Sequence, residues 1–124
     1  MLVFDHVGTL VRDLEKAKAE YETLTGESAT ESTRVESQKV NISFVGNVEL
    51  IQPDADTPLA RLLDVGAVFY HVAYKTLYFD QEVGRLLESS YIKVDEAFNS
   101  EVFGGKRCQF FRNNLGHLIE LVEG

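Results

Sequence analysis

Residues 69–74 read FYHVAY and repeat a pattern that the chain has already shown at residues 4–9, which read FDHVGT. Both stretches are rich in β-branched and aromatic residues, a composition that favours an extended backbone. In each, a histidine (His6 or His71) follows two places after a phenylalanine, so the two side chains share one face of a strand. We therefore predict that these stretches are the first strands of two copies of one module.

An acidic residue stands in the last strand expected for each copy. Glu49 lies in the apolar run 48–51, and Glu120 lies in the apolar run 118–122. The order along the chain is thus His, Glu, His, Glu, with nearly equal spacing inside the two copies. A carboxylate inside an apolar strand is costly to bury without a partner.

Two imidazoles and two carboxylates form a mixed nitrogen and oxygen donor set, which suits Zn, Co, Ni, Mn or Fe. If the two copies pack around a pseudo-twofold axis, the four side chains converge in one cleft. The alternative is that each histidine and glutamate points to solvent or forms an ordinary ion pair. The residues by themselves leave both interpretations open.

The first module, about residues 1–53, is predicted to have the order β-α-β-β-β. Asp13 is a good helix N-cap and Gly26 a good C-terminal stop for a helix with apolar residues at helical spacing. The expected elements are a strand at 2–11, a helix at 13–25, a weak edge strand at 29–35 and a hairpin over 39–53 that turns at 46–47.

A connector, about residues 54–66, leads into a second module, about residues 67–124. Thr57 followed by Pro58 predicts the start of a short helix at 59–63. The second module is expected to contain a strand at 67–75, a helix at 78–90 that buries Phe79, Val83, Leu86 and Leu87, and strands at 92–97, 106–112 and 117–123. The predicted fold is α+β: a single domain of tandem β-α-β-β-β modules forming a curved eight-stranded half-barrel.

Composition narrows the classes of partner. The chain has 124 residues and a formal net charge of −8, which argues against nucleic acid or an anionic membrane as the main partner. No apolar run approaches the roughly 20 residues that a membrane-spanning helix needs. A single cysteine, Cys108, excludes an internal disulfide and fits a reducing compartment, so we expect a cytoplasmic protein.

Several short motifs in the same order resemble the vicinal oxygen chelate superfamily, which includes glyoxalase I, methylmalonyl-CoA epimerase, fosfomycin-resistance proteins and extradiol dioxygenases. The resemblance covers essentially the whole chain and is closest to the branch of methylmalonyl-CoA epimerase and glyoxalase I. The motifs are DHV at 5–7, DLEKA at 13–17, ELIQP at 49–53, TPLARLL at 57–63, YHVA at 70–73, GGKR at 104–107 and GHLIEL at 116–121.

The resemblance implies a metal-dependent isomerase, epimerase or lyase that abstracts a proton next to a thioester or hemithioacetal carbonyl and stabilises the resulting enediolate on the metal. It implies one divalent ion (Zn, Co, Ni or Mn), an acyl-CoA or a glutathione adduct as the substrate, and a homodimer. The implied metal ligands are His6, Glu49, His71 and Glu120, and either glutamate could also move the proton.

One departure concerns the proton shuttle. Epimerase-like chains usually carry Glu-Gln-Gly-Val before the third strand, whereas residues 37–40 here read SQKV and Glu36 stands one place earlier. A shift of one residue in a strand turns a side chain to the other face. Glu36 is a third candidate for the catalytic acid, but the shift of one place can turn its side chain away from the metal.

Basic residues near the third strand of the second module are candidates for substrate binding, because they could receive a phosphate or carboxylate. They are Lys106, Arg107 and Arg112, and the alternative is that they are solvated surface residues. A different class of function also stays open: the same fold can serve as a non-catalytic protein that binds or sequesters a small molecule.

Overall fold

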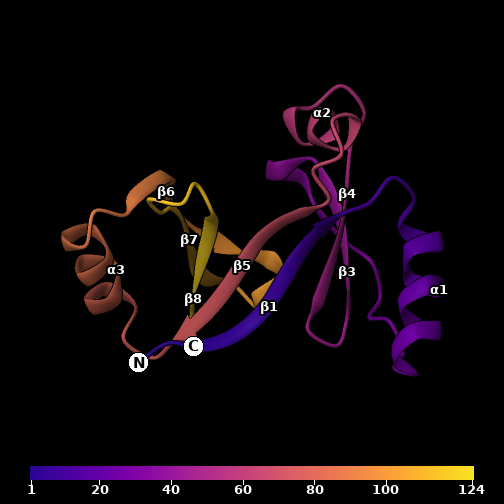
Figure 1. Ribbon diagram of the computed structural model, residues 1–124. Helices are drawn as coiled ribbons and strands as arrows, with labels where there is room; N and C mark the ends of the chain where they lie inside the picture. The colour runs from indigo at the N-terminus through magenta and orange to yellow at the C-terminus, as the bar shows by residue number, and fades with distance from the viewer. The chain divides into compact units, whose positions relative to one another are not determined.

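The computed structural model describes residues 1–124 (Figure 1). It contains eight strands, three α-helices and two short 3-10 helices. In chain order they are β1 (Val3–Leu10), α1 (Leu14–Thr25), β2 (Thr33–Val35), η1 (Glu36–Gln38), β3 (Val40–Val45), β4 (Val48–Pro53), α2 (Pro58–Asp64), β5 (Phe69–Thr76), α3 (Phe79–Glu88), β6 (Ile92–Ser100), η2 (Glu101–Phe103), β7 (Lys106–Arg112) and β8 (Leu118–Glu123).

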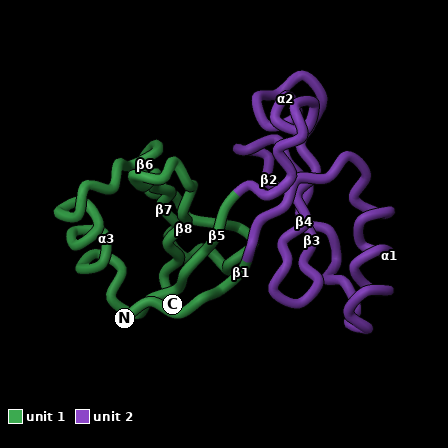
Figure 2. The backbone as a smooth tube through the Cα atoms, viewed as in Figure 1, with its two compact units in different colours: residues 1–6, 71–124 green, residues 7–70 purple.

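The chain divides into two compact units (Figure 2). Unit 1 comprises residues 1–6 and 71–124, and unit 2 comprises residues 7–70. Strand β1 passes from unit 1 into unit 2 between His6 and Val7. The strands form one mixed sheet in the order β2-β3-β4-β1-β5-β8-β7-β6. The predicted α+β fold of tandem β-α-β-β-β modules is confirmed.

Strand register shows the repetition most directly. In unit 2, β1 and β4 run parallel and Gly8 pairs with Glu49. In unit 1, β5 and β8 run parallel and Ala73 pairs with Glu120. Each paired residue stands two places after the histidine of its own copy, so both modules place their acid at the same register relative to that histidine.

The helix boundaries follow local capping chemistry. The Asp13 side chain accepts a hydrogen bond from the Lys16 backbone N–H, and Gly26 ends α1 with a φ of 76°, a left-handed conformation that favours glycine. Thr57 caps α2 in the same way by accepting from the Ala60 N–H, and Pro58 occupies the first turn. These predicted caps are confirmed.

Unit 1 has apolar residues on both faces of its strands. Phe79 and Leu86 of α3 pack with Phe111 and Leu121 on one face. A second buried cluster consists of Ala73, Cys108 and Val122, with Phe98 and Phe103 packed against it. Because side chains alternate along a strand, β7 carries Phe111 to the helix side and Cys108 and Phe110 to the other side.

Unit 2 contains a buried apolar cluster, formed by Leu14 of α1 with Val45 and Leu50 of the hairpin. A bidentate ion pair anchors its edge strand β2: Arg34 donates to the two carboxylate oxygens of Asp54 at 2.7 and 2.8 Å. The expected edge strand at 29–35 is therefore present, but it is shortened to three residues.

Two details differ from the prediction. Leu87, expected to be buried by α3, is 42% exposed, because the apolar face of this helix is centred on Phe79, Val83 and Leu86. Strand β6 runs to Ser100 instead of ending near residue 97, and its pairing with β7 shifts between Val94 and Phe98. None of the three α-helices combines the length with the apolar character that crossing a membrane requires.

Candidate metal centre

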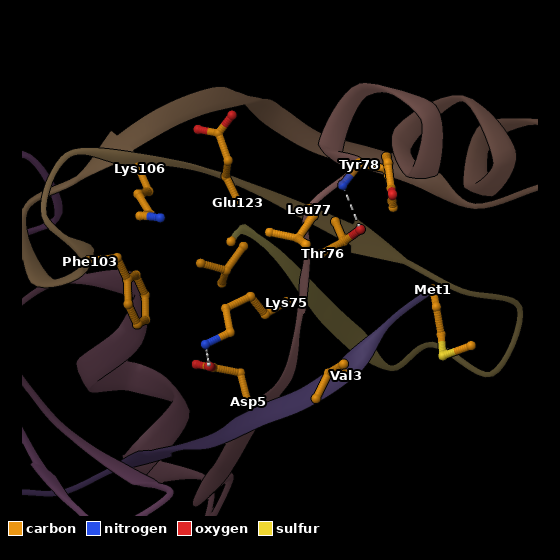
Figure 3. Close-up of a pocket in the computed structure, with 12 residues that line it drawn as sticks. Met1, Val3, Asp5, Lys75, Thr76, Leu77, Tyr78, Phe103, Lys106 and Glu123 are labelled. Atoms are coloured by element: carbon orange, nitrogen blue, oxygen red, sulfur yellow. Dashed lines mark hydrogen bonds and ion pairs between the residues drawn. The ribbon is translucent and has the colours of Figure 1, made fainter.

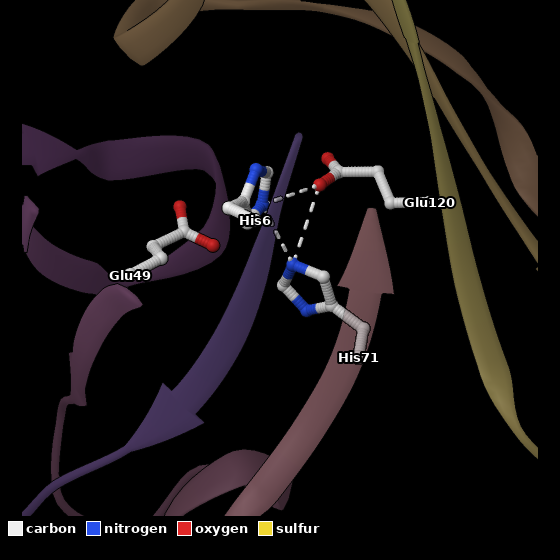
Figure 4. A group of neighbouring side chains, drawn as sticks. All are labelled: His6, Glu49, His71 and Glu120. Carbon is white, nitrogen blue, oxygen red and sulfur yellow. Dashed lines mark hydrogen bonds and ion pairs between the residues drawn. The ribbon is translucent and has the colours of Figure 1, made fainter. Parts of the chain in front are cut away.

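Three of the four predicted ligands converge inside unit 1 (Figure 4). The Nε2 atoms of His6 and His71 lie 3.2 Å apart. Glu120 Oε1 lies 3.1 Å from the first of these nitrogens and 3.3 Å from the second. All three side chains are buried. Two imidazole nitrogens and one carboxylate oxygen therefore lie within 3.3 Å of one another.

Strand geometry accounts for the meeting of His71 and Glu120. They belong to the parallel neighbours β5 and β8, where Ala73 pairs with Glu120. His71 stands two places before Ala73, so it points to the same face as Ala73 and Glu120. The sequence repeat predicts this arrangement, and the structure shows it.

The distances fit a metal ion. Zn–N and Zn–O bonds of about 2.1 Å separate two ligand atoms by about 3.0 Å at a right angle and by about 3.4 Å at the tetrahedral angle. The three distances of 3.1, 3.2 and 3.3 Å between the donor atoms fall within that interval. One ion can thus contact all three atoms with little movement of the side chains.

The second ring nitrogen of His6, Nδ1, is held by a hydrogen bond with Asp5. His6 Nδ1 lies 2.7 Å from Asp5 Oδ2, and the other oxygen of Asp5 lies 3.7 Å from Lys75 Nζ. Since an ionised carboxylate only accepts hydrogen bonds, we assign the donating N–H to Nδ1. When the ring is neutral, this tautomer leaves the lone pair on Nε2, the atom that faces Glu120 and His71.

Aromatic rings enclose the two histidines. Phe103 of η2 stacks on His6, with ring centroids 5.4 Å apart and an angle of 27° between the planes. Phe110 of β7 meets His71 edge to face at 5.2 Å, and Phe98 stacks on Phe110. These rings keep water away from the donor atoms, which strengthens electrostatic interactions at the site.

The electrostatics of Glu120 match the role of a ligand. Burial raises the pKa of Glu120, but hydrogen bonds from the imidazoles of His6 and His71, together with their charge, outweigh burial and lower the pKa to about 2. Glu120 is therefore a carboxylate at neutral pH. A bound cation would take the place of the imidazole protons, because metal ligation requires neutral histidines.

Glu49, the fourth predicted ligand, is a buried residue of β4 in unit 2. Its pairing with Gly8 puts it on the same face of the continuous strand β1 as His6, two places away. Glu49, His6, His71 and Glu120 form a group of buried side chains that could hold a metal ion.

The other predicted site residues have different surroundings. Glu36 lies in η1, its side chain is 80% exposed, and its carboxylate accepts a hydrogen bond from Arg34 Nε at 2.9 Å. Arg107 is engaged by Asp80 and Glu123, and Arg112 donates to the Gly116 carbonyl oxygen. Lys106 faces a cavity of unit 1, described below.

Sequence reasoning missed Asp5 and the aromatic enclosure. Adjacent residues of a strand normally point to opposite faces, so the pattern hides the contact between Asp5 and His6. Phe103 precedes a glycine pair in a segment expected to be a loop, and nothing in the local pattern indicates its contact with His6. The signal for Asp5 was the DHV motif itself, in which a carboxylate adjoins the histidine.

The chain is similar to known proteins in sequence and in fold. An uncharacterized protein of Bacillus subtilis, YqjC, is 31% identical over 96% of this chain and 90% of its own length. Methylmalonyl-CoA epimerase from Mycobacterium tuberculosis is 25% identical, with a TM-score of 0.84 over 97% of this chain and 86% of that chain. A single-residue variant of the Streptomyces coelicolor methylmalonyl-CoA epimerase, in complex with 2-nitronate-propionyl-CoA, is 19% identical and has the same fold, with a TM-score of 0.84 over 98% of this chain and 94% of that chain.

A protein-family model matches residues 5–110 of the chain. The matched span begins at Asp5, which contacts His6, and ends at Phe110, which contacts His71. It therefore includes both copies of the histidine strand and Glu49, whereas Glu120 lies beyond it. The chain belongs to the glyoxalase/bleomycin resistance protein/dioxygenase superfamily.

Proposed function

We propose that the protein is a metal-dependent enzyme of the epimerase and glyoxalase type, which moves a proton next to the carbonyl of an acyl-CoA thioester or a hemithioacetal. The proposed ligands of its single divalent ion (Zn, Co, Ni or Mn) are His6, Glu49, His71 and Glu120. The observation that carries the proposal is the convergence of two imidazole nitrogens and a carboxylate oxygen at 3.1 to 3.3 Å inside unit 1.

A divalent ion in this donor set would supply Lewis-acid stabilisation for negative charge that develops beside the substrate carbonyl. The protein's own residues do the rest. Asp5 orients His6, while Phe103 and Phe110 shield the donor atoms from water. Proton transfer needs a carboxylate within reach of the substrate, and the candidates are Glu49, Glu120 and Glu36.

An acyl-CoA thioester is the first substrate to test. Its support is the similarity to the Mycobacterium tuberculosis epimerase and to the Streptomyces coelicolor epimerase described above. The hemithioacetal formed from glutathione and methylglyoxal is the second, because the matching family model also describes glyoxalases. The resemblance further leads us to expect a homodimer, which light scattering after size-exclusion chromatography would test.

The test is exchange with solvent deuterium, measured by mass spectrometry on methylmalonyl-CoA and on the hemithioacetal. We expect metal-dependent uptake of one deuterium by one of these substrates. Replacing the proton-transferring carboxylate with glutamine should abolish uptake, so Glu36→Gln, Glu49→Gln and Glu120→Gln are compared. A variant that loses exchange but keeps its metal identifies the base, whereas one that loses both identifies a ligand.

A binding protein without turnover is the second candidate. The observation in its favour is that Glu36 is largely exposed and paired with Arg34, so the proton-shuttle position of the epimerase-like pattern lacks a free buried acid. This function predicts that the protein binds the metal and an acyl-CoA but exchanges no deuterium. Uptake of deuterium by either substrate excludes it.

A further inference from the structure

Unit 1 contains a cavity of about 610 Å³ where β1 begins and where β5 and β8 end (Figure 3). Its volume is within the range of about 300 to 1,000 Å³ that is typical of small-molecule sites. Much of the wall is apolar and open to solvent; Leu77, for example, is 79% exposed. Contiguous apolar surface of this kind is stabilised when a ligand covers it.

The cavity adjoins the candidate metal centre through two side chains. Asp5 lines the cavity and also accepts the hydrogen bond from His6 Nδ1. Phe103 lines it as well, and its ring stacks on the His6 imidazole. A molecule in the cavity therefore contacts the residues that hold His6 in place.

Two acidic and two basic side chains line the cavity: Asp5, Glu123, Lys75 and Lys106. Asp5 is paired with Lys75 at 3.7 Å, and Glu123 is paired with Arg107 at 2.9 Å. Lys106 also lines the cavity, but its ammonium group has no carboxylate within 4.0 Å. Lys106 is therefore the charged side chain of the wall that forms no ion pair within 4.0 Å.

We infer that this cavity binds an amphipathic anion, whose apolar body lies against the wall and whose carboxylate or phosphate pairs with Lys106. The inference rests on the proposed function in one respect: it takes this anion to be part of the acyl-CoA substrate. Lys106 is then the residue that selects for negative charge, and Phe103 is the contact between the bound ligand and the metal centre.

The experiment uses the fluorescent dye anilinonaphthalene sulfonate, an apolar body with one anionic group, titrated into protein treated with a chelator. Loss of the charged contact in Lys106→Glu should weaken dye binding by about tenfold or more. Lys93→Glu makes the same charge change on β6, away from the cavity, and should leave binding unchanged. Phenylnaphthylamine, the uncharged analogue, should bind the wild type and both variants equally.

Equal affinity of the wild type and Lys106→Glu for the anionic dye overturns the inference, as does an equal loss in both variants. Acetyl-CoA should displace the dye from the wild type. Failure of displacement, with dye binding still dependent on Lys106, would show that the ligand is not an acyl-CoA. That result leaves the metal centre untouched, because metal content and the deuterium exchange described above test the proposed function separately.

Discussion

At the scale of single residues, the contact between Asp5 and His6 holds one imidazole in an orientation that would suit a metal ligand. The 2.7 Å hydrogen bond fixes both the orientation and the tautomer of the ring. Lys75 lies 3.7 Å from the other oxygen of Asp5. Carboxylates in such positions raise the affinity of a histidine for metal without touching the ion.

Replacing this carboxylate should therefore weaken metal binding. We expect Asp5→Asn to lower the affinity for Zn or Co by about tenfold, the lower end of the range for residues that orient a ligand. Competition with a chromophoric chelator measures it. Asp64→Asn is the matched control, because Asp64 is an exposed carboxylate that pairs with Arg12. Unchanged affinity in Asp5→Asn would show that His6 needs no such support.

At the scale of elements, the parts set by local chemistry were predictable. Capping residues predicted the ends of α1 and the start of α2. The side chains of Asp13 and Thr57 accept hydrogen bonds from free backbone N–H groups, and Gly26 adopts the left-handed conformation that ends α1. Strand β6 was predicted too short. Its register shifts around Asp95, which has a φ of 63° and whose carbonyl oxygen accepts a hydrogen bond from Gln109. Because this hydrogen bond joins β6 to β7, no local sequence pattern predicts it.

The edge strand β2 is held by a charge pair that can be titrated. The hydrogen bonds from Arg34 hold the pKa of Asp54 below its usual value of 3.8. A lowered folded-state pKa means that the pair stabilises the fold above the usual value and that this stabilisation is lost as pH falls through the folded pKa. We expect Arg34→Met to raise the pKa of Asp54 to its ordinary range, as measured by NMR titration of the carboxyl carbon. An unshifted titration in the variant would mean that Arg34 does not hold Asp54 in solution.

The helix-facing core of unit 1 gives a prediction about stability. Phe111 is fully buried between α3 and the sheet. Truncating such a side chain leaves a cavity, so Phe111→Ala should lower the free energy of unfolding by about 3 to 5 kcal/mol. Urea denaturation measures the change. The same substitution at Phe69, which is 75% exposed, should cost far less; equal losses would contradict the assigned core.

At the scale of the whole chain, the repeat is what pointed to the candidate site. Glu49 pairs with Gly8 and Glu120 pairs with Ala73, so each copy sets its acid at the same register from its own histidine. Sequence periodicity can reveal such a relation, because it depends only on strand alternation and parallel pairing. Sequence periodicity could not predict the cavity beside Lys106. The residues that line the cavity come from segments far apart in the chain, from Val3 to Glu123.

His6, His71, Glu120 and Glu49 are the proposed ligands of one divalent ion, and the metal content of the protein tests this proposal most directly. Protein purified without chelator, then dialysed against Zn, Co, Ni or Mn, is analysed by inductively coupled plasma mass spectrometry. The variants are His6→Ala, Glu120→Gln and Glu49→Gln, with His117→Ala as the control, because His117 is the exposed third histidine.

We predict about one metal ion per chain in the wild type and in His117→Ala. Glu49→Gln should bind the ion with a much lower affinity, and His6→Ala and Glu120→Gln should contain none. Circular dichroism confirms that each variant is folded, so that a lost ion is not a consequence of unfolding. A wild-type protein that takes up none of the four metals, or a folded His6→Ala variant that keeps a full equivalent, would contradict the claim.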